Sequence, residues 1–179
     1  MFKTTEDSRI QISELMKPSH ANFGGKIHGG YILSLMDNVA FACASKHSRS
    51  YCVTASVNKV NFLNPIEVGE LVTMKASVNY VGKSSMVVGI RVESENIRTG
   101  ETKHCNSSYF IMVAVDEEGN KVTVPGLILT NKLSAKRFIK SIIRRDSDIK
   151  RSKDLHQLYK NVEDHLEQLK DYRVKIDFK

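Results

Sequence analysis

The sequence predicts an α+β domain in which one antiparallel sheet packs on one long helix. Residues 31–46 carry apolar side chains at three- and four-residue steps, as an amphipathic helix does. Segments on both sides of this helix alternate apolar and polar residues, one segment before it and four after it. The gaps between the later segments are too short for crossover helices, so neighbouring strands should pair antiparallel. This order of elements places a single sheet on a single helix.

A loop separates the first strand from the helix. Residues 9–16 alternate weakly and end before Pro18, which cannot donate a hydrogen bond within a sheet. Residues 19–30 are small and polar, as is typical of loops. The helix runs from Tyr31 to about Lys46, and several alanines keep its other side narrow enough for a sheet to wrap closely. Its apolar stripe consists of Ile32, Leu35, Met36, Val39 and Cys43.

The four later strands are expected over residues 53–58, 71–80, 86–93 and 107–115. Turn sequences that contain Gly69, Gly82, Gly100 and Gly119 lie at the breaks in the pattern. The side chains expected to share a face are Val53, Ala55 and Val57; then Val72, Met74, Ala76, Val78 and Tyr80; then Met86, Val88, Ile90 and Val92; and finally Tyr109, Ile111, Val113 and Val115.

Length and charge divide the chain into a domain and an extension. Pro125 and Gly126 mark the predicted boundary, with a domain at residues 1–126 and a basic helical extension at 127–179. A hydrophobic fraction of 41% is enough for a sizeable core and excludes wholesale disorder. Residues 1–130 hold 13 Lys and Arg against 12 Asp and Glu, whereas residues 131–179 hold 14 against 8. The net charge of +7 therefore belongs mainly to the extension.

The extension is predicted to be helical in two parts. Residues 131–145 form a basic amphipathic helix with six Lys and Arg and no acid. Residues 154–176 show the heptad spacing of a short coiled coil, although His165 occupies one of the apolar positions.

Several classes of protein are excluded or disfavoured. The three cysteines are odd in number and lack CxxC spacing, which argues against a disulfide framework or zinc knuckle and suits a reducing compartment. No apolar run is long enough for a membrane span, and the first residues lack a secretory signal, so we expect a cytoplasmic location. There is no GxSxG elbow, P-loop or metal-ligand spacing. A hydrolase here would need to activate water directly, with no cofactor or metal.

The junction between loop and helix holds the first candidate residues. Gly29 and Gly30 directly precede the helix, where free backbone N–H groups and the helix dipole favour negative charge. Glycine also permits a ligand to approach the backbone closely, so this junction could be an oxyanion site. On spacing alone, a simple helix cap or tight turn is the more common explanation of such a pair.

Asp37 is the sharper candidate. It falls beside the apolar stripe, and no Lys or Arg stands three or four residues away to pair with it. Such a carboxylate either faces water or is held in a cleft, where it can act as a general base or nucleophile. Asn22, His20 and His28 could also take part, but loop residues of these types more often serve turn geometry, hydrogen bonding or packing. Lys83, Ser84 and Ser85 could hold a phosphate or form an ordinary hairpin turn.

The segment from Asn22 to Asp37 resembles the N-x-x-G-x-x-x-G-G-x-[IL]-x-x-x-M-D signature of hotdog-fold acyl-CoA thioesterases. The segments Val57–Pro65, Val68–Glu70 and Gly82–Met86 also resemble that family, and the similarity extends over about residues 8–118. The resemblance implies a five-stranded antiparallel sheet around one long helix, and an enzyme that hydrolyses acyl-CoA to a free fatty acid and coenzyme A. Coenzyme A would enter as part of the substrate.

The resemblance also implies site residues. Asn22 and Asp37 match the family's catalytic positions and would meet from different protomers of a dimer, which could assemble further into a hexamer. Gly30 would supply the oxyanion N–H, while Gly29, Lys83, Ser84 and Ser85 would contact coenzyme A. Asn58 departs from the pattern, because many relatives carry an acid there, so its role is open.

Two alternatives keep the fold but change the function. An acyl-CoA-binding regulator could use the basic extension to reach nucleic acid, but no helix-turn-helix is evident, so we expect no nucleic-acid partner. A hydratase would need an Asp-His pair, and His20 and His28 lie in the wrong segment for that motif. The basic helix itself could cover a partner's surface, attract coenzyme A or lie on an anionic membrane. A solvated helix that packs on the domain is the simplest reading.

Overall fold

The computed structural model describes residues 1–158 and 162–177 of the chain. These residues form two compact units, Met1–Ser141 and Ile142–Lys179. The elements of the first unit are β1 (Phe2–Thr4), α1 (Thr5–Ser8), β2 (Ile10–Leu15), a 3₁₀ turn (Pro18–His20), α2 (Gly29–Ser48), β3 (Tyr51–Val57), β4 (Leu71–Val81), β5 (Ser85–Glu95), β6 (Thr102–Val115), β7 (Gly126–Ile128) and the start of α3 (Lys132–Leu158).

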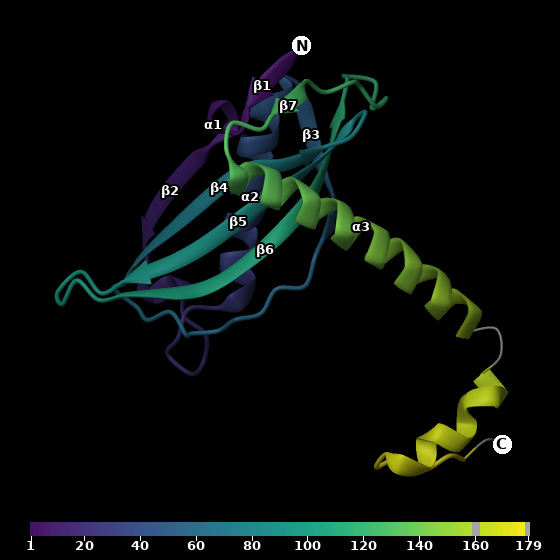
Figure 1. Cartoon of the computed structure of the whole chain (residues 1–179). Coiled ribbons are helices and arrows are strands. Elements are labelled where there is room, and N and C mark those ends of the chain that lie inside the picture. Colours follow the sequence, from purple (N-terminus) through teal and green to yellow (C-terminus); the bar gives the residue numbers. More distant parts are fainter. Residues whose placement is uncertain (159–161, 178–179) are drawn as a thin grey trace. The chain divides into compact units, whose positions relative to one another are not determined.

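One five-stranded antiparallel sheet wraps α2 (Figure 1), with strand order β2-β4-β5-β6-β3. The helix contacts all five strands. This confirms the predicted hotdog architecture of one strand, one long helix and four strands. Because β2 and β3 lie at the two edges, each leaves one row of backbone groups unpaired within the sheet.

The core lies between α2 and the concave face of the sheet. The predicted helical stripe is confirmed, since Ile32, Met36, Val39 and Cys43 are buried and Leu35 packs against them. Ala40 and Ala44 are also fully buried, so the sheet approaches the helix backbone closely. The sheet contributes several large buried side chains, among them Val72, Met74, Val78, Met86, Val88, Val92, Phe110 and Met112.

A β-bulge in β4 corrects one predicted face. Val78 pairs with Val88, but Tyr80 pairs with Val87, because the register shifts between Val78 and Tyr80. Tyr80 therefore lies on the outer face of the sheet, opposite Val78, and its ring contacts Phe138 of α3 at 4.9 Å between centroids. The prediction that Tyr80 shares the face of Val78 was wrong, since one extra residue reverses the alternation beyond it.

A second bulge, in β3, also reverses the predicted alternation of faces. Its register shifts between Thr54 and Ser56, so Val53 pairs with Val113 while Val57 pairs with Phe110. Val113 and Phe110 point to opposite faces of β6, and the predicted common face of Val53 and Val57 is therefore wrong. In β6 the predicted set that includes Tyr109 does share one face, but it is the outer face, because Phe110 and Met112 are the buried residues.

A short strap that the sequence did not predict closes one end of the domain. β1 and β7 form a parallel two-stranded sheet, in which Phe2 pairs with Gly126. The imidazole of His47, fully buried in the last turn of α2, lies with its Nε2 3.0 Å from the Pro125 carbonyl oxygen. The Lys3 ammonium donates to the His47 carbonyl at 2.6 Å. These contacts tie both ends of the domain to the C-terminal end of α2.

The extension is helical, but it does not form the continuous helix expected over residues 154–176. The basic amphipathic helix is confirmed as the beginning of α3, which ends at Leu158. Residues 159–161 of the expected heptads lie outside the described residues, and Val162–Asp171 is a 3₁₀-helix, in which heptad positions no longer share a face. The compact first unit continues to Ser141, past the boundary expected at residue 126, because the first turns of α3 pack on it.

Among residues 1–158 and 162–177, no helix is long and apolar enough to cross a membrane. The same residues contain no group of three or more His, Cys, Asp or Glu side chains placed to hold a metal ion.

Candidate active site

Asp37 lies on the flank of α2 that faces the edge strand β3. Its Oδ1 accepts a hydrogen bond of 2.6 Å from the Thr54 hydroxyl. The carboxylate is half-buried and forms no ion pair with any residue in the described parts of the chain. Within the same residues its Oδ2 accepts no hydrogen bond. Asp37 is thus an oriented carboxylate with one oxygen free for water or substrate.

Thr54 is a site residue that the sequence did not reveal. It stands in β3 directly before the bulge, opposite Met112, whose Sδ lies 3.5 Å from the Thr54 hydroxyl. A threonine is ordinary in a strand, and only the tertiary pairing of β3 with α2 brings its hydroxyl to Asp37. No local pattern in the sequence marks that contact.

Asn22 shapes the loop before α2 through its side-chain oxygen. This Oδ1 accepts hydrogen bonds from the backbone N–H groups of Gly24 (2.9 Å) and Lys26 (3.2 Å). Gly25 has a positive φ of 77°, as such a tight turn requires. The turn role expected for an Asn in this loop is confirmed. The Asn22 Nδ2 donates to no described residue, and the side chain is exposed, so its amide remains available as a donor.

The first turn of α2 is capped by a histidine. Gly29 begins the helix, and the Nδ1 of His28 accepts a hydrogen bond of 3.0 Å from the Gly30 N–H. Because Nδ1 accepts, the proton of a neutral His28 ring is on Nε2. The Gly30 N–H, predicted from the sequence as an oxyanion donor, is thus already hydrogen-bonded to the imidazole. Beside it, the exposed Phe62 ring lies 3.2 Å from the position of a Cβ on Gly29, so a side chain there would push the ring aside by a few tenths of an ångström.

Asp37 and Gly30 lie about two turns apart on α2. Seven residues of α-helix separate them, which at ~1.5 Å per residue is about 10 Å along the axis. An attacking water and the oxyanion it creates lie about 3 Å from their respective partners. In the described residues no contact joins Asn22 to Asp37 either. The geometry divides the candidate residues into a loop half, with Asn22 and Gly30, and a helix half, with Asp37 and Thr54.

His20 belongs to a packed group beside the loop half. Its ring stacks on Tyr31, with centroids 4.0 Å apart. The Tyr31 hydroxyl donates to Glu14 at 2.5 Å, and this hydrogen bond raises the pKa of Tyr31 to about 12. The Lys17 N–H donates to His20 Nδ1 at 3.3 Å. These contacts agree with the packing and hydrogen-bonding reading of His20.

The turn of Lys83, Ser84 and Ser85 connects β4 to β5. Its backbone is fixed, since the carbonyl oxygens of Lys83 and Ser84 accept hydrogen bonds of 2.9 Å from the N–H groups of Val124 and Ala114. The Lys83 side chain is exposed. The residues thus form the hairpin turn that the sequence indicates, with a lysine directed to solvent.

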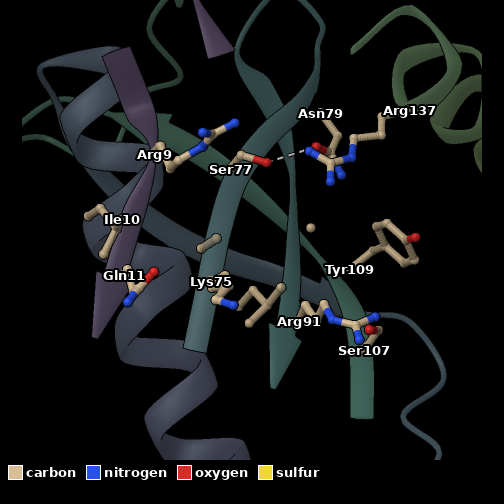
Figure 2. Close-up of a pocket in the computed structure, with 13 residues that line it drawn as sticks. Arg9, Ile10, Gln11, Lys75, Ser77, Asn79, Arg91, Ser107, Tyr109 and Arg137 are labelled. Carbon is tan, nitrogen blue, oxygen red and sulfur yellow. Dashed lines mark hydrogen bonds between the residues drawn. The ribbon is translucent and has the colours of Figure 1, made fainter. Parts of the chain in front are cut away.

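A hollow of about 400 Å³ lies on the outer face of the sheet, away from α2 (Figure 2). No predicted site residue lines it, and neither does any acidic residue. Lys75 and Arg91 at its edge both pair with Glu93, at 2.6 Å each. The Ser77 hydroxyl donates to the Asn79 side chain at 3.2 Å, and that amide occupies the space that the missing side chain of Gly89 leaves. This hollow is separate from the Asp37 site.

Comparison with known proteins places this chain in a family. Residues 24–101 match the family model described as Thioesterase superfamily. The protein VdlD of Helicobacter pylori is 41% identical over 143 residues, which are 80% of this chain and 82% of VdlD. The crystal structure of an apo-hexameric acyl-CoA thioesterase is 33% identical, with a TM-score of 0.82 over 84% of this chain and 97% of the other.

A third relative bears on individual residues. The acyl-CoA hydrolase of Staphylococcus aureus, solved in complex with butyryl coenzyme A, coenzyme A and coenzyme A disulfide, is 26% identical, with a TM-score of 0.80 over 90% of this chain and 99% of the other. Structures of that enzyme include alanine variants of an asparagine, an aspartate and a threonine, separated by 15 and 17 residues. Asn22, Asp37 and Thr54 are separated by the same 15 and 17 residues.

Proposed function

Because this chain belongs to the hotdog-fold acyl-CoA thioesterase family, we propose that it hydrolyses acyl-CoA to a free fatty acid and coenzyme A at a site built around Asp37. The observation that carries the assignment is the hydrogen bond between Asp37 and Thr54, in a trio whose spacing matches the three positions varied in the Staphylococcus aureus enzyme. A carboxylate without a cationic partner has an oxygen available to accept a proton from water, and one hydroxyl is enough to fix its orientation.

In the proposed reaction Asp37 takes a proton from water, and the water oxygen attacks the thioester carbonyl carbon. The carbonyl electrons move to the oxygen, which is stabilised by the Gly30 N–H and the Asn22 amide. When the C–S bond breaks, the electron pair leaves with sulfur, and the proton held by Asp37 can pass to the thiolate. Direct attack by the Asp37 carboxylate, followed by hydrolysis of the resulting anhydride, gives the same products.

The two halves of the site would come from two chains. About 10 Å of helix separates Gly30 from Asp37, and no hydrogen bond joins Asn22 to Asp37 in the described residues, so we assign the loop half to one protomer and the helix half to another. The edge strand β3, beside Asp37, carries exposed Tyr51, Val53 and Val57, and Phe41 of α2 packs on Tyr51 at 5.4 Å between centroids. Joining two sheets at β3 would cover these apolar side chains and satisfy the free edge. Further assembly into a trimer of such dimers follows the hexameric relative.

Coenzyme A would extend from this carbonyl toward solvent. Gly29 at the helix start leaves room for the pantetheine arm beside Phe62. The exposed Lys83, flanked by the hydroxyls of Ser84 and Ser85 in a fixed turn, offers a cation and hydrogen-bond donors for phosphate. This assignment predicts that a substitution of Lys83 changes the affinity for coenzyme A and leaves the rate of the chemical step unchanged.

A thiol-release assay with acyl-CoAs of short, medium and long chain tests the proposal. The Asp37→Asn variant should lose activity by about 10²–10⁴-fold, as expected for removal of a general base. Asp154→Asn, an exposed helical aspartate on α3, is the matched control and should turn over normally. Wild-type turnover in a folded Asp37→Asn protein would remove Asp37 from the mechanism. Absence of thiol release by the wild-type protein with every acyl-CoA would reject the function itself.

A further inference from the structure

In the first turns of α3, serine side chains face the domain and aliphatic side chains face solvent. At ~100° per residue, Ser134, Phe138 and Ser141 share one side of the helix. Phe138 packs on Tyr80 of the sheet, and Ser134 and Ser141 are only 5% and 2% exposed. Their hydroxyls donate to the backbone carbonyls of Asn131 and Arg137, at 2.7 and 2.9 Å. Serines therefore occupy the side that an ordinary surface helix fills with apolar residues.

The opposite side of the same turns carries the apolar residues. A sector of about 120° holds five residues, which we call the outward face of α3. Leu133 and Ile139 in it are each 56% exposed. The three lysines lie between these two residues in the sector, and residues 131–145 contain no acid. The outward face consists of Lys132, Leu133, Lys136, Ile139 and Lys140.

The helix is held in this orientation by more than one contact. The Asn131 side chain accepts a hydrogen bond of 2.9 Å from the Ser134 N–H, and the Ser134 hydroxyl accepts one of 3.2 Å from the Asn131 N–H. This reciprocal cap fixes the first turn, and the Tyr80–Phe138 contact fixes the second. Rotating Ile139 inward would break both sets of contacts, so the exposed apolar side chains are a stable property of the fold.

We propose that the outward face of α3 docks the protein on an anionic lipid surface. A row of lysines flanked by aliphatic side chains suits the boundary of a bilayer, where the aliphatic groups enter the acyl region and the ammonium groups reach the headgroups. Anionic headgroups attract each lysine near the surface. The substrate and product of the proposed enzyme are lipids, although the docking does not depend on catalysis.

Other occupants fit the outward face less well. Interfaces between proteins are depleted in lysine, and a second copy of this helix would bring three more lysines against these three. Nucleic acid would use the lysines but would gain little from Leu133 and Ile139, because the phosphate backbone offers no apolar contact. An anionic bilayer uses both the charge and the apolar side chains.

Vesicle flotation with the full-length protein tests the proposal. Binding is expected to vesicles of phosphatidylcholine mixed with phosphatidylglycerol, but not to phosphatidylcholine alone, and high salt should release the protein. Lys136→Gln with Lys140→Gln should weaken binding about tenfold or more. Ile139→Ser should also weaken it. Ile97→Ser, at a residue that is 57% exposed on a hairpin, and Lys121→Gln with Lys170→Gln are matched controls that should bind normally.

Three outcomes would overturn the proposal. The first is no difference between the two vesicle types. The second is equal binding by the Ile139→Ser and Ile97→Ser variants. The third is a fall in oligomeric mass for Ile139→Ser, measured by light scattering without lipid, which would assign the outward face to a contact between copies. Thiol release from soluble acyl-CoA should stay unchanged in all these variants, so a failure of docking is distinguishable from a failure of the catalytic proposal.

Discussion

The two ends of α2 have opposite surroundings. At its first turn His28 and Gly30 are exposed, and their hydrogen bonds lie within the loop segment itself. At its last turn His47 is fully buried and contacts Pro125 and Lys3, which are distant in sequence. Asp37 lies between the two, half-buried beside β3. One helix thus has exposed candidate site residues at its beginning and long-range packing contacts at its end.

This difference separates the expected effects of substitution. Changes at the exposed His28 and the half-buried Asp37 should alter turnover and leave the fold intact, because neither side chain belongs to the buried core. Changes near its end should alter stability and leave the chemistry unaffected. Each of the following experiments tests this difference between the two ends of α2.

After Asp37, the largest effect is expected at Asn22. Asn22→Asp keeps an oxygen that can accept from the Gly24 and Lys26 N–H groups, so the loop should persist, but it loses the amide donor. We expect kcat to fall by about 10–10³-fold, as for loss of one oxyanion donor. Thermal unfolding should show little change. If Asn22→Asp retains activity that Asn22→Ala loses, the role of Asn22 is confined to the turn.

A smaller loss is expected at Thr54. Thr54→Val has nearly the same shape but cannot donate to Asp37, and a hydrogen bond to a charged group is worth a factor of about 10–100. We expect kcat to fall by that factor, while Thr54→Ser restores most of it because the hydroxyl remains. Steady-state kinetics with saturating acyl-CoA measure the change. Equal activity of the valine and serine variants would show that the hydroxyl does not orient Asp37.

The cap at His28 should affect stability modestly. His28→Ala removes the acceptor of the Gly30 N–H, and loss of a helix cap lowers the free energy of unfolding by about 1 kcal/mol. Denaturant unfolding measures this, with His156→Ala on the exposed surface of α3 as the control. A destabilisation much above that size would mean that the beginning of α2 supports the fold as strongly as its end does.

The pH dependence of stability should report on His47. Burial lowers the pKa of His47, and its hydrogen bond with the Pro125 carbonyl opposes the shift only in part. Below the ordinary histidine pKa of ~6.5, the unfolded chain therefore binds a proton that the folded chain does not. The contribution of His47 is complete above that pH and is lost as the pH falls through the lowered pKa. His47→Gln should remove this part of the pH dependence, and an unchanged profile would contradict it.

Much of the fold could be predicted because its periodicities are local. The stripe of Ile32, Met36 and Val39 and the alternation around Val88 and Ile90 are written in neighbouring residues, and both proved to be buried. The face of Tyr80 could not be predicted, because a bulge depends on how two strands pair. The side-chain amide of Asn79, the residue before Tyr80, occupies the space above Gly89, which is ten residues away in the sequence. The β1–β7 strap was missed for the same reason.

The site could be predicted only in part. Asn22 and Asp37 were found through the spacing of a motif, and the structure gives each a geometry suited to its proposed role. Thr54 was missed because its significance is a tertiary contact across 17 residues. The His28 cap on Gly30 was missed because histidine is not a usual capping residue, and its Nδ1 reaches the N–H only in one tautomer and orientation.

We propose that Asn22 of one protomer and Asp37 of another complete a single site. Subunits carrying Asn22→Ala and subunits carrying Asp37→Asn should be mixed under conditions in which mass spectrometry shows subunit exchange. Random two-fold pairing gives about a quarter of the sites both intact residues, so about a quarter of wild-type thiol release should return. Mixing Asn22→Ala with the double variant should restore none. If exchange is complete and the first mixture stays inactive, the shared site is contradicted.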